Sequence, residues 1–348
     1  MTLGRFMVGL AGPQLSGAER ELLRRPGVGG VLLFTRNYTD MPQLRALCRE
    51  VHALRSPPLL IAVDQEGGPV QRFREPFTDL PPLGALGRCY DQDAGRALGL
   101  ARTTGWLMAA ELRSVGVDLS FAPVTDLDHG LSTVIGERAF HREPDAVTRL
   151  ARAYTQGMGE AGMAATLKHF PGHGAVAADS HRELPVDERR WSRIEHTDLL
   201  PFARLTEEEA GAVMLAHVVY SRCDPAPAGF SHYWIQDVLR RRLRFQGVAF
   251  SDDLGMAAAA QAGDLASRAR MALQAGCDMV LVGNELDALP ALLERVPASD
   301  PVSALRLARL HGGRDAPDWD ALHRCRRWRE AQRSVRGYDH GRSLELPV

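Results

Sequence analysis

The chain has 348 residues, 45% of them hydrophobic, and a formal net charge of -1. This composition can form a sizeable core, and the balanced charge gives no overall attraction to nucleic acid or to an anionic membrane. No apolar run reaches the ~18 residues of a membrane-spanning helix, and the first residues lack the pattern of a signal peptide. The five cysteines are scattered without CxxC spacing, as reduced thiols would be. We therefore expect a globular, cytoplasmic protein that binds neither nucleic acid nor membranes.

Short apolar runs rich in branched residues recur along the chain, most of them followed by a helix-like stretch. Near-continuous hydrophobic runs of this kind are typical of parallel strands covered on both faces. Helices are predicted over residues 41–55, 145–162 and 265–276, and the last two end in a glycine, as a helix C-cap would. The predicted strands span residues 6–11, 29–34, 57–64, 117–126, 163–170, 211–217, 247–253 and 277–284.

Eight strand–helix units predict an α/β protein with a single (β/α)8 barrel, the TIM-type fold, over residues 1–300. Residues 301–348 are predicted to form a C-terminal helical extension packed on the barrel. A doubly wound open sheet is the alternative, but "GLAGPQLSG" after the first strand lacks the glycine spacing of a dinucleotide-binding loop.

Polar residues stand where the predicted strands end. A barrel brings such residues together at one face, where the active sites of this fold lie. The sequence therefore predicts a site at the carboxyl ends of the strands. The residues concerned are Asp64, Asp126, Asp128, Lys168, His169, His217, Asp252, Asp253 and Asn284.

The stretch "KHFPGHGAVAADSH", residues 168–181, carries the only lysine among 42 basic residues. A compact ammonium at Lys168 suggests a role that the planar guanidinium of arginine could not fill. His169 and His173 have the spacing of a zinc site, but Pro171 would disrupt the helix that such a site needs, so we expect no metal. His173 is instead expected to lie in a turn and bond backbone carbonyls.

The end of this stretch predicts a proton-transfer pair. Asp179 can orient His181 and raise its pKa toward neutrality, which suits a group that gives and takes a proton. A carboxylate at the end of the seventh strand, paired with such a group on a mobile loop, is the layout of a retaining glycosidase. Asp64 and Lys168 would hold sugar hydroxyls. Gly172 and Gly174 are expected to let the loop move.

Several motifs together resemble glycoside hydrolase family 3, in particular its β-N-acetylglucosaminidases. The resemblance runs in the same order from about residue 5 to residue 290. The motifs are "KHFPGHG…ADSH…LPVD" (168–187), "VDQEGGPVQRF" (63–73), "FAPVTDLDH" (121–129), "VIGERAFH" (134–141), "FSDDLGM" (250–256), "GGVLLFTRN" (29–37) and "AGCDMVLVGN" (275–284).

The resemblance implies a role for each matching residue. Asp252 would be the nucleophile, His181 the acid/base and Asp179 its partner, while Asp253 should point elsewhere by strand alternation. Residues expected to line the site less directly are Asp128 and His217. The residues that would bind the N-acetylglucosamine ring are Asp64, Arg72, Arg138, Lys168 and His169.

Two positions depart from the family pattern and could alter the wall of the site. Pro69 stands where arginine is usual, and Leu215 where threonine is usual.

The resemblance also implies a substrate. It points to the cytoplasmic enzyme of peptidoglycan recycling in Gram-negative bacteria, which removes β-1,4-linked N-acetylglucosamine from 1,6-anhydro-N-acetylmuramoyl peptides. We expect a monomer that needs no cofactor. Three alternatives stay open: a phosphorylase using the same pair, a mechanism in which the substrate's acetamido group is the nucleophile, and a non-catalytic sugar-binding barrel.

Overall fold

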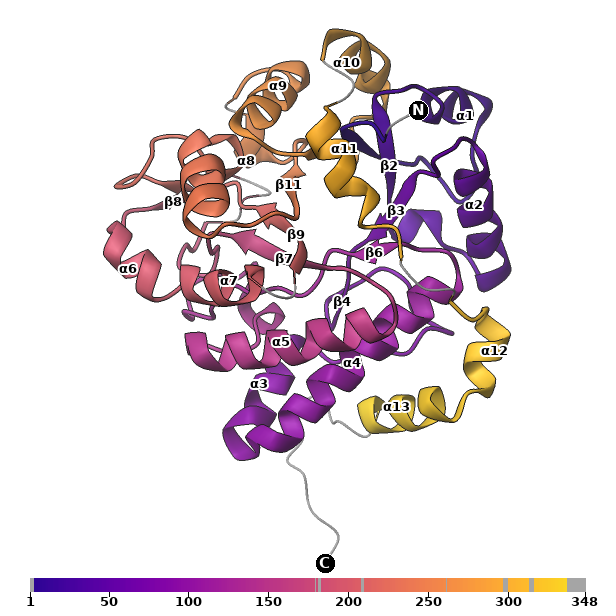
Figure 1. Ribbon diagram of the computed structural model, residues 1–348, viewed down its shortest axis with the longest axis horizontal. Helices are drawn as coiled ribbons and strands as arrows, with labels where there is room; N and C mark the ends of the chain where they lie inside the picture. Colours follow the sequence, from indigo (N-terminus) through magenta and orange to yellow (C-terminus); the bar gives the residue numbers. More distant parts are fainter. Residues whose placement is uncertain are drawn as a thin grey trace, which may run out of the picture.

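The computed structural model describes residues 3–178, 180, 183–207, 210–260, 262–296, 300–312 and 316–336. Within them, eight parallel strands form one sheet in the order β6-β3-β2-β1-β12-β11-β9-β7 (Figure 1). The strands are β1 (Phe6–Gly9), β2 (Val28–Leu33), β3 (Leu60–Val63), β6 (Leu119–Ser120), β7 (Ala165–Phe170), β9 (Ala210–Leu215), β11 (Val248–Asp253) and β12 (Met279–Val282).

The sheet closes on itself between the chain that follows β6 and strand β7. The Thr166 amide donates to the Ala122 carbonyl at 2.9 Å, and the Thr125 amide donates to the Lys168 carbonyl at 2.7 Å. Val124 and Lys168 form a parallel bridge between these bonds. The predicted (β/α)8 barrel is therefore confirmed, and the open-sheet alternative is wrong.

Helices surround the barrel. The helices predicted from the sequence appear as α2, α5 and α9, and Gly276 ends α9 in the left-handed conformation at φ 119° because it lacks a Cβ. The helices are α1 (Gly17–Leu23), α2 (Met41–Ala53), α3 (Leu83–Gln92), α4 (Ala94–Ser114), α5 (Pro144–Glu160), α6 (Trp191–His196), α7 (Leu199–Thr206), the π-helical η4 (Tyr233–Arg242), α8 (Ala257–Ala260), α9 (Leu265–Ala275), α10 (Leu289–Arg295), α11 (Pro301–Ala308), α12 (Trp319–Arg324) and α13 (Arg326–Arg336).

Short elements follow several strands. The shorter strands are β4 (Gln65–Gly67), β5 (Val70–Gln71), β8 (Val186–Asp187) and β10 (Val219–Tyr220), and the 3₁₀ turns are η1 (Thr35–Asn37), η2 (Gly136–Arg138), η3 (Ala228–Phe230) and η5 (Leu286–Ala288). The β4–β5 hairpin and η1 follow β3 and β2 directly, so they lie at the carboxyl-end face of the barrel.

The apolar side chains form two clusters. One fills the space between strands and helices, and a smaller one fills the barrel interior with side chains such as Phe121, Met214 and Phe250. Leu307 and Leu310, after the last strand, belong to the interior cluster. Leu310 lies near Gly211 at the start of β9, so it covers the amino-end face of the barrel.

The C-terminal helices pack on the barrel. Helix α11 is fixed to the start of β12, because Ser303 Oγ donates to Asp278 and Arg306 forms an ion pair with the same carboxylate, both at 2.9 Å. Helices α12 and α13 lie beside α4 (Figure 1). The Trp328 indole of α13 donates to Glu111 of α4 at 2.9 Å. Residues 337–348 of the predicted extension lie outside the described residues.

Among the residues that the structure describes, no helix is both long enough and apolar enough to cross a membrane.

Candidate active site

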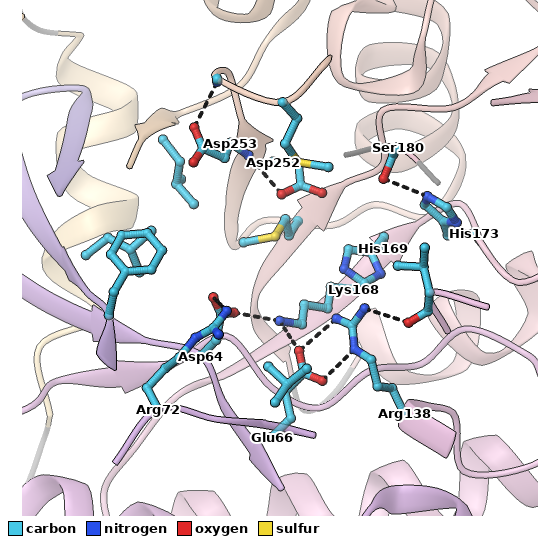
Figure 2. Close-up of a pocket in the computed structure, with 18 of the residues that line it drawn as sticks. Asp64, Glu66, Arg72, Arg138, Lys168, His169, His173, Ser180, Asp252 and Asp253 are labelled. Carbon is cyan, nitrogen blue, oxygen red and sulfur yellow. Dashed lines mark hydrogen bonds and ion pairs between the residues drawn. The ribbon is translucent and has the colours of Figure 1, made fainter. Parts of the chain in front are cut away.

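A cavity of about 430 Å³ opens at the carboxyl ends of the strands (Figure 2). Its polar wall comes from the ends of β3, β7 and β11 and from η2, and its apolar floor from Leu32, Met214 and Leu281 of the interior cluster. The sequence predicted a site at this face. The lining residues are Leu32, Phe34, Asp64, Glu66, Val70, Arg72, Val134, Arg138, Lys168, His169, His173, Ser180, Met214, Asp252, Asp253, Gly255, Met256, Leu281 and Asn284.

Lys168 is the centre of a buried ionic network. Its ammonium lies 2.8 Å from Asp64 Oδ1 and 2.5 Å from Glu66 Oε1, and the side chain is 2% exposed. Arg138 donates two parallel hydrogen bonds of 2.9 Å to the same Glu66 carboxylate. Figure 2 shows these groups converging on one side of the cavity. A single ammonium that serves two carboxylates at different angles explains why this position holds lysine in an arginine-rich chain.

The network keeps Glu66 and Lys168 charged. Burial raises the pKa of Glu66, but Arg138 and Lys168 outweigh it and hold that pKa well below its usual range. Burial lowers the pKa of Lys168, but Asp64 and Glu66 reverse the effect and leave it above its usual value. The cavity therefore presents fixed charges and hydrogen-bond donors of the kind that recognise sugar hydroxyls.

Arg72 lies beside this network. Its guanidinium is 3.6 Å from Asp64 Oδ2 and 6.0 Å from the centre of the Phe34 ring. One wall of the cavity thus combines four residues that were predicted from distant stretches of the sequence: Asp64, Arg72, Arg138 and Lys168.

His169 is held by Asp126. The Asp126 carboxylate accepts from the His169 amide at 3.1 Å and lies 2.7 Å from His169 Nδ1. Fixing Nδ1 in this way leaves Nε2 as the ring nitrogen available to a ligand.

The same carboxylate accepts from the His173 amide at 2.7 Å, so Asp126 ties the end of β7 to the loop that follows. The prediction that the His173 ring bonds backbone carbonyls is wrong. Its Nε2 lies 3.1 Å from Ser180 Oγ instead, because Ser180 folds back to the cavity wall.

Asp252 ends β11 at the cavity. Burial raises its pKa, but the neighbouring imidazoles of His169 and His217 outweigh that effect and hold the pKa below its usual range. The Asp253 amide also donates to Asp252 Oδ1 at 2.8 Å. Asp252 is therefore held as an ionised carboxylate at the cavity, which is the form in which such a group can attack a substrate.

Asp253 lines the cavity too, whereas strand alternation predicted that it would point elsewhere. The pairing of β11 with β12 shifts register between Phe250 and Asp253, which breaks the alternation. Burial raises the pKa of Asp253 to about 6, and the amides of Gly255 and Gly283, which donate to it at 2.9 and 3.3 Å, offset this only in part.

Two predicted lining residues do not reach the cavity. Asp128 borders a separate surface hollow, where its carboxylate accepts from the Gly130 amide at 2.9 Å. His217 is fully buried behind Asp252, and its Nε2 donates to the Asp253 carbonyl at 3.2 Å. His217 thus touches the site through backbone, and its ring stacks on Phe230 with centroids 5.2 Å apart.

The predicted proton-transfer residues Asp179 and His181 lie outside the described residues. Ser180, between them in sequence, is a described residue of the cavity wall, and its carbonyl accepts from the Ala258 amide at 3.1 Å.

The two departures from the family pattern lie away from the cavity lining. Pro69 is exposed in the β4–β5 hairpin, and Leu215 is buried in the cluster between strands and helices. The structure also gives Gly174 a packing role, since a Cβ there would meet the Leu127 carbonyl oxygen at 1.8 Å.

Sequence reasoning assigned no role to Glu66 and none beyond a strand-end position to Asp126. The signal for Glu66 was its spacing: it stands two residues after Asp64, so it faces the same side of an extended chain. Asp126 was found at a strand end, but its bond to His169 depends on barrel closure. In the described part of the chain, no group of three or more His, Cys, Asp or Glu could hold a metal ion.

Comparison with known proteins agrees with this geometry. The family described as glycosyl hydrolase family 3, N-terminal domain, matches residues 5–307. The chain belongs to that family and is a glycoside hydrolase.

Within the family, the chain resembles one particular kind of enzyme along its whole length. It is 58% identical to a β-hexosaminidase of Alkalilimnicola ehrlichii and 54% identical to one of Thioalkalivibrio sulfidiphilus, with both chains covered completely in each case. Among solved structures, NagZ from Neisseria gonorrhoeae in complex with N-trifluoroacetyl-D-glucosamine is similar with a TM-score of 0.93 and 43% identity, over 97% of this chain and 98% of that one.

Proposed function

We propose that the enzyme is a retaining exo-β-N-acetylglucosaminidase that forms a covalent glycosyl–aspartate intermediate. The observation that carries this proposal is the ionised Asp252 carboxylate facing a cavity whose opposite wall is the Lys168 network. The resemblance to β-hexosaminidases, and to a solved relative that holds an N-acylglucosamine analogue, supports the choice of sugar.

The proposed reaction is a double displacement. An Asp252 oxygen forms a bond to the anomeric carbon while the bond from that carbon to the leaving oxygen breaks. His181, oriented by Asp179, gives its proton to that oxygen. Neutral His181 then takes a proton from water, whose oxygen attacks the anomeric carbon and displaces the Asp252 carboxylate. N-acetylglucosamine leaves with its configuration retained.

The wall residues would hold the sugar during both steps. Asp64 and Arg72 present an acceptor and a donor at the cavity, and Lys168, Arg138 and His169 offer further donors. Because the network is already assembled and buried, it would not have to reorganise when the sugar binds. The nearly buried Lys168 and Glu66 close one end of the cavity, which supports removal of a single terminal sugar.

The physiological substrate follows from the same resemblance. We propose β-1,4-linked N-acetylglucosamine on 1,6-anhydro-N-acetylmuramoyl peptides, within peptidoglycan recycling, cleaved by a monomer in the cytoplasm. The five cysteines are all free of disulfides, which supports a reducing compartment.

Trapping the intermediate tests the mechanism. Incubation with a fluorinated N-acetylglucosaminide that slows the second step should add one sugar mass to the peptide that contains Asp252, and the Asp252→Asn variant should give no adduct. An adduct on another residue, or release of the inverted anomer, would contradict the mechanism. Retention without any adduct would point to the substrate's acetamido group as nucleophile. A sugar 1-phosphate in phosphate buffer would identify a phosphorylase.

A further inference from the structure

Arg36 is a fixed cation at the rim of the active-site cavity that the proposed mechanism does not use. It comes from η1, just after β2, and its side chain crosses the carboxyl ends of the neighbouring strands β1 and β12. Its Nε donates to the Leu10 carbonyl at 2.8 Å, one terminal nitrogen to the Gly283 carbonyl at 2.7 Å and the other to Asn284 Oδ1 at 3.0 Å. These three bonds hold the guanidinium in one place.

The guanidinium touches two residues of the cavity lining. It lies 4.3 Å from the centre of the Phe34 ring, and it bonds directly to the side chain of Asn284. The residue is exposed, unlike Lys168 and Glu66 at the closed end of the cavity. A sugar bound among those buried groups would send its leaving group outward, toward the rim where Arg36 lies.

Arg36 also differs from the other arginines of the site in its partners. Arg138 is paired with Glu66 and Arg72 with Asp64, whereas among the described residues no carboxylate lies within ion-pair distance of Arg36. Its hydrogen bonds go to two carbonyls and the Asn284 amide oxygen, and the Asp253 carboxylate acts on its charge only from beyond ion-pair distance. With three of its five N–H groups used, two donors remain for a ligand.

We propose that Arg36 is a specificity-determining residue that binds a carboxylate on the leaving group, so that the enzyme prefers glycosides with an anionic aglycone. The inference rests on the proposed glycosidase function and names the class of aglycone. A guanidinium held in place beforehand binds a carboxylate at little entropic cost, and such charge-assisted bonds are stronger than neutral ones. The competing explanation is that Arg36 only clamps the ends of β1, β2 and β12.

Two aryl β-N-acetylglucosaminides distinguish these explanations: one with a 3-carboxyphenyl leaving group and one with the matched 3-carbamoylphenyl group. The measured quantity is the ratio of their kcat/KM values in one enzyme preparation, which cancels any loss of folded protein. The unmodified enzyme should prefer the carboxylate by roughly 10-fold, mostly through KM, and added salt should reduce the preference. Arg36→Gln should bring the ratio close to one, and Arg36→Lys should keep part of it.

The control is Arg24→Gln, which removes an exposed arginine at the end of α1 and should leave the ratio unchanged. An identical ratio in the unmodified enzyme and Arg36→Gln would overturn the proposal. An equal fall in kcat/KM for both substrates in Arg36→Gln, together with a lower melting temperature, would show that Arg36 only stabilises the ends of these strands. If the unmodified enzyme cleaves neither substrate, it is the proposed glycosidase function that fails.

Discussion

Glu66 is the least exposed carboxylate of the cavity wall that we propose to bind the sugar, and it neutralises two cations at once. It is 1% exposed and is paired with both Lys168 and Arg138. Removing one member of a buried ionic group leaves the others without compensation, which typically costs about 3 kcal/mol or more.

We therefore expect Glu66→Gln to lower kcat/KM for an aryl N-acetylglucosaminide by roughly 100-fold, mainly through KM, and to lower the melting temperature by several degrees. The matched control is Glu137→Gln in η2, because Glu137 pairs with Arg88 only at the surface, where such pairs contribute little. Steady-state kinetics and thermal unfolding measure both effects. Equal behaviour of the two variants would contradict a special role for Glu66.

Asp253 makes the stability of the protein depend on pH. Burial raises its pKa from 3.8 to about 6, so the folded state holds this proton more tightly than the unfolded state does. The associated stability is fully present below pH 3.8 and is lost as the pH rises through about 6. The difference between the pKa of Asp253 in the folded and the unfolded state contributes about 3 kcal/mol at most to the free energy of unfolding.

Asp253→Asn should remove this dependence. Urea unfolding at a series of pH values should show the unmodified enzyme losing up to about 3 kcal/mol, relative to the variant, between pH 4 and pH 7. A constant difference between the two proteins over that range would mean that Asp253 is ionised throughout.

Most of the wall of the site could be predicted from single residues, and the failures have physical causes. Lys168, His169 and Asp252 stand at strand ends, and a barrel brings strand ends together. The direction of Asp253 was missed because the register shift at the end of β11 leaves no trace in the sequence. The partner of the His173 ring was missed because it depends on how the loop folds back to Ser180.

At the level of elements, the strands were predicted within a few residues, apart from β6. A strand was predicted over residues 117–126, but only Leu119–Ser120 form one. Pro123 has no amide hydrogen to donate, so the chain beyond β6 joins β7 through a few bonds and not through a full ladder. The irregular segment that results places Asp126 beside His169.

Helix α13 is fixed to α4 by a buried polar contact. Trp328 donates its indole N–H to Glu111, whose carboxylate also accepts from the Thr78 amide and hydroxyl at 2.9 and 2.7 Å. Trp328→Phe keeps most of the ring but leaves the carboxylate with one donor fewer. We expect a loss of about 1–2 kcal/mol in the free energy of unfolding.

Denaturant unfolding measures this loss, and Arg326→Ala is the control within the same helix. Arg326 is exposed and paired with Glu330 one turn away, so its removal should lower the free energy of unfolding much less than Trp328→Phe does. A Trp328→Phe variant as stable as the unmodified enzyme would show that the indole bond does not hold α13 in place.

For the whole molecule, the core is continuous from the barrel into the C-terminal helices. Trp319, Leu322, Trp328 and Val335 belong to the same apolar cluster as the outer faces of the strands. We expect tryptophan fluorescence and far-UV circular dichroism to report one coincident unfolding transition. Native-state hydrogen exchange should also give the amides of α13 nearly the protection of those in α5. An earlier transition confined to α12 and α13 would contradict a shared core.

The apolar floor of the cavity is the upper layer of the barrel interior, and it contains none of the groups that would carry the chemistry. Leu32, Met214 and Leu281 fill space there, while the charges stand on the walls. Shape and reactivity are thus encoded by separate sets of side chains. Exchanges of similar volume among the three floor residues should alter which acyl group or ring substituent fits, while Asp252 and the ionic network stay as they are. Substitutions at the floor should therefore change which sugar the enzyme prefers while it stays active.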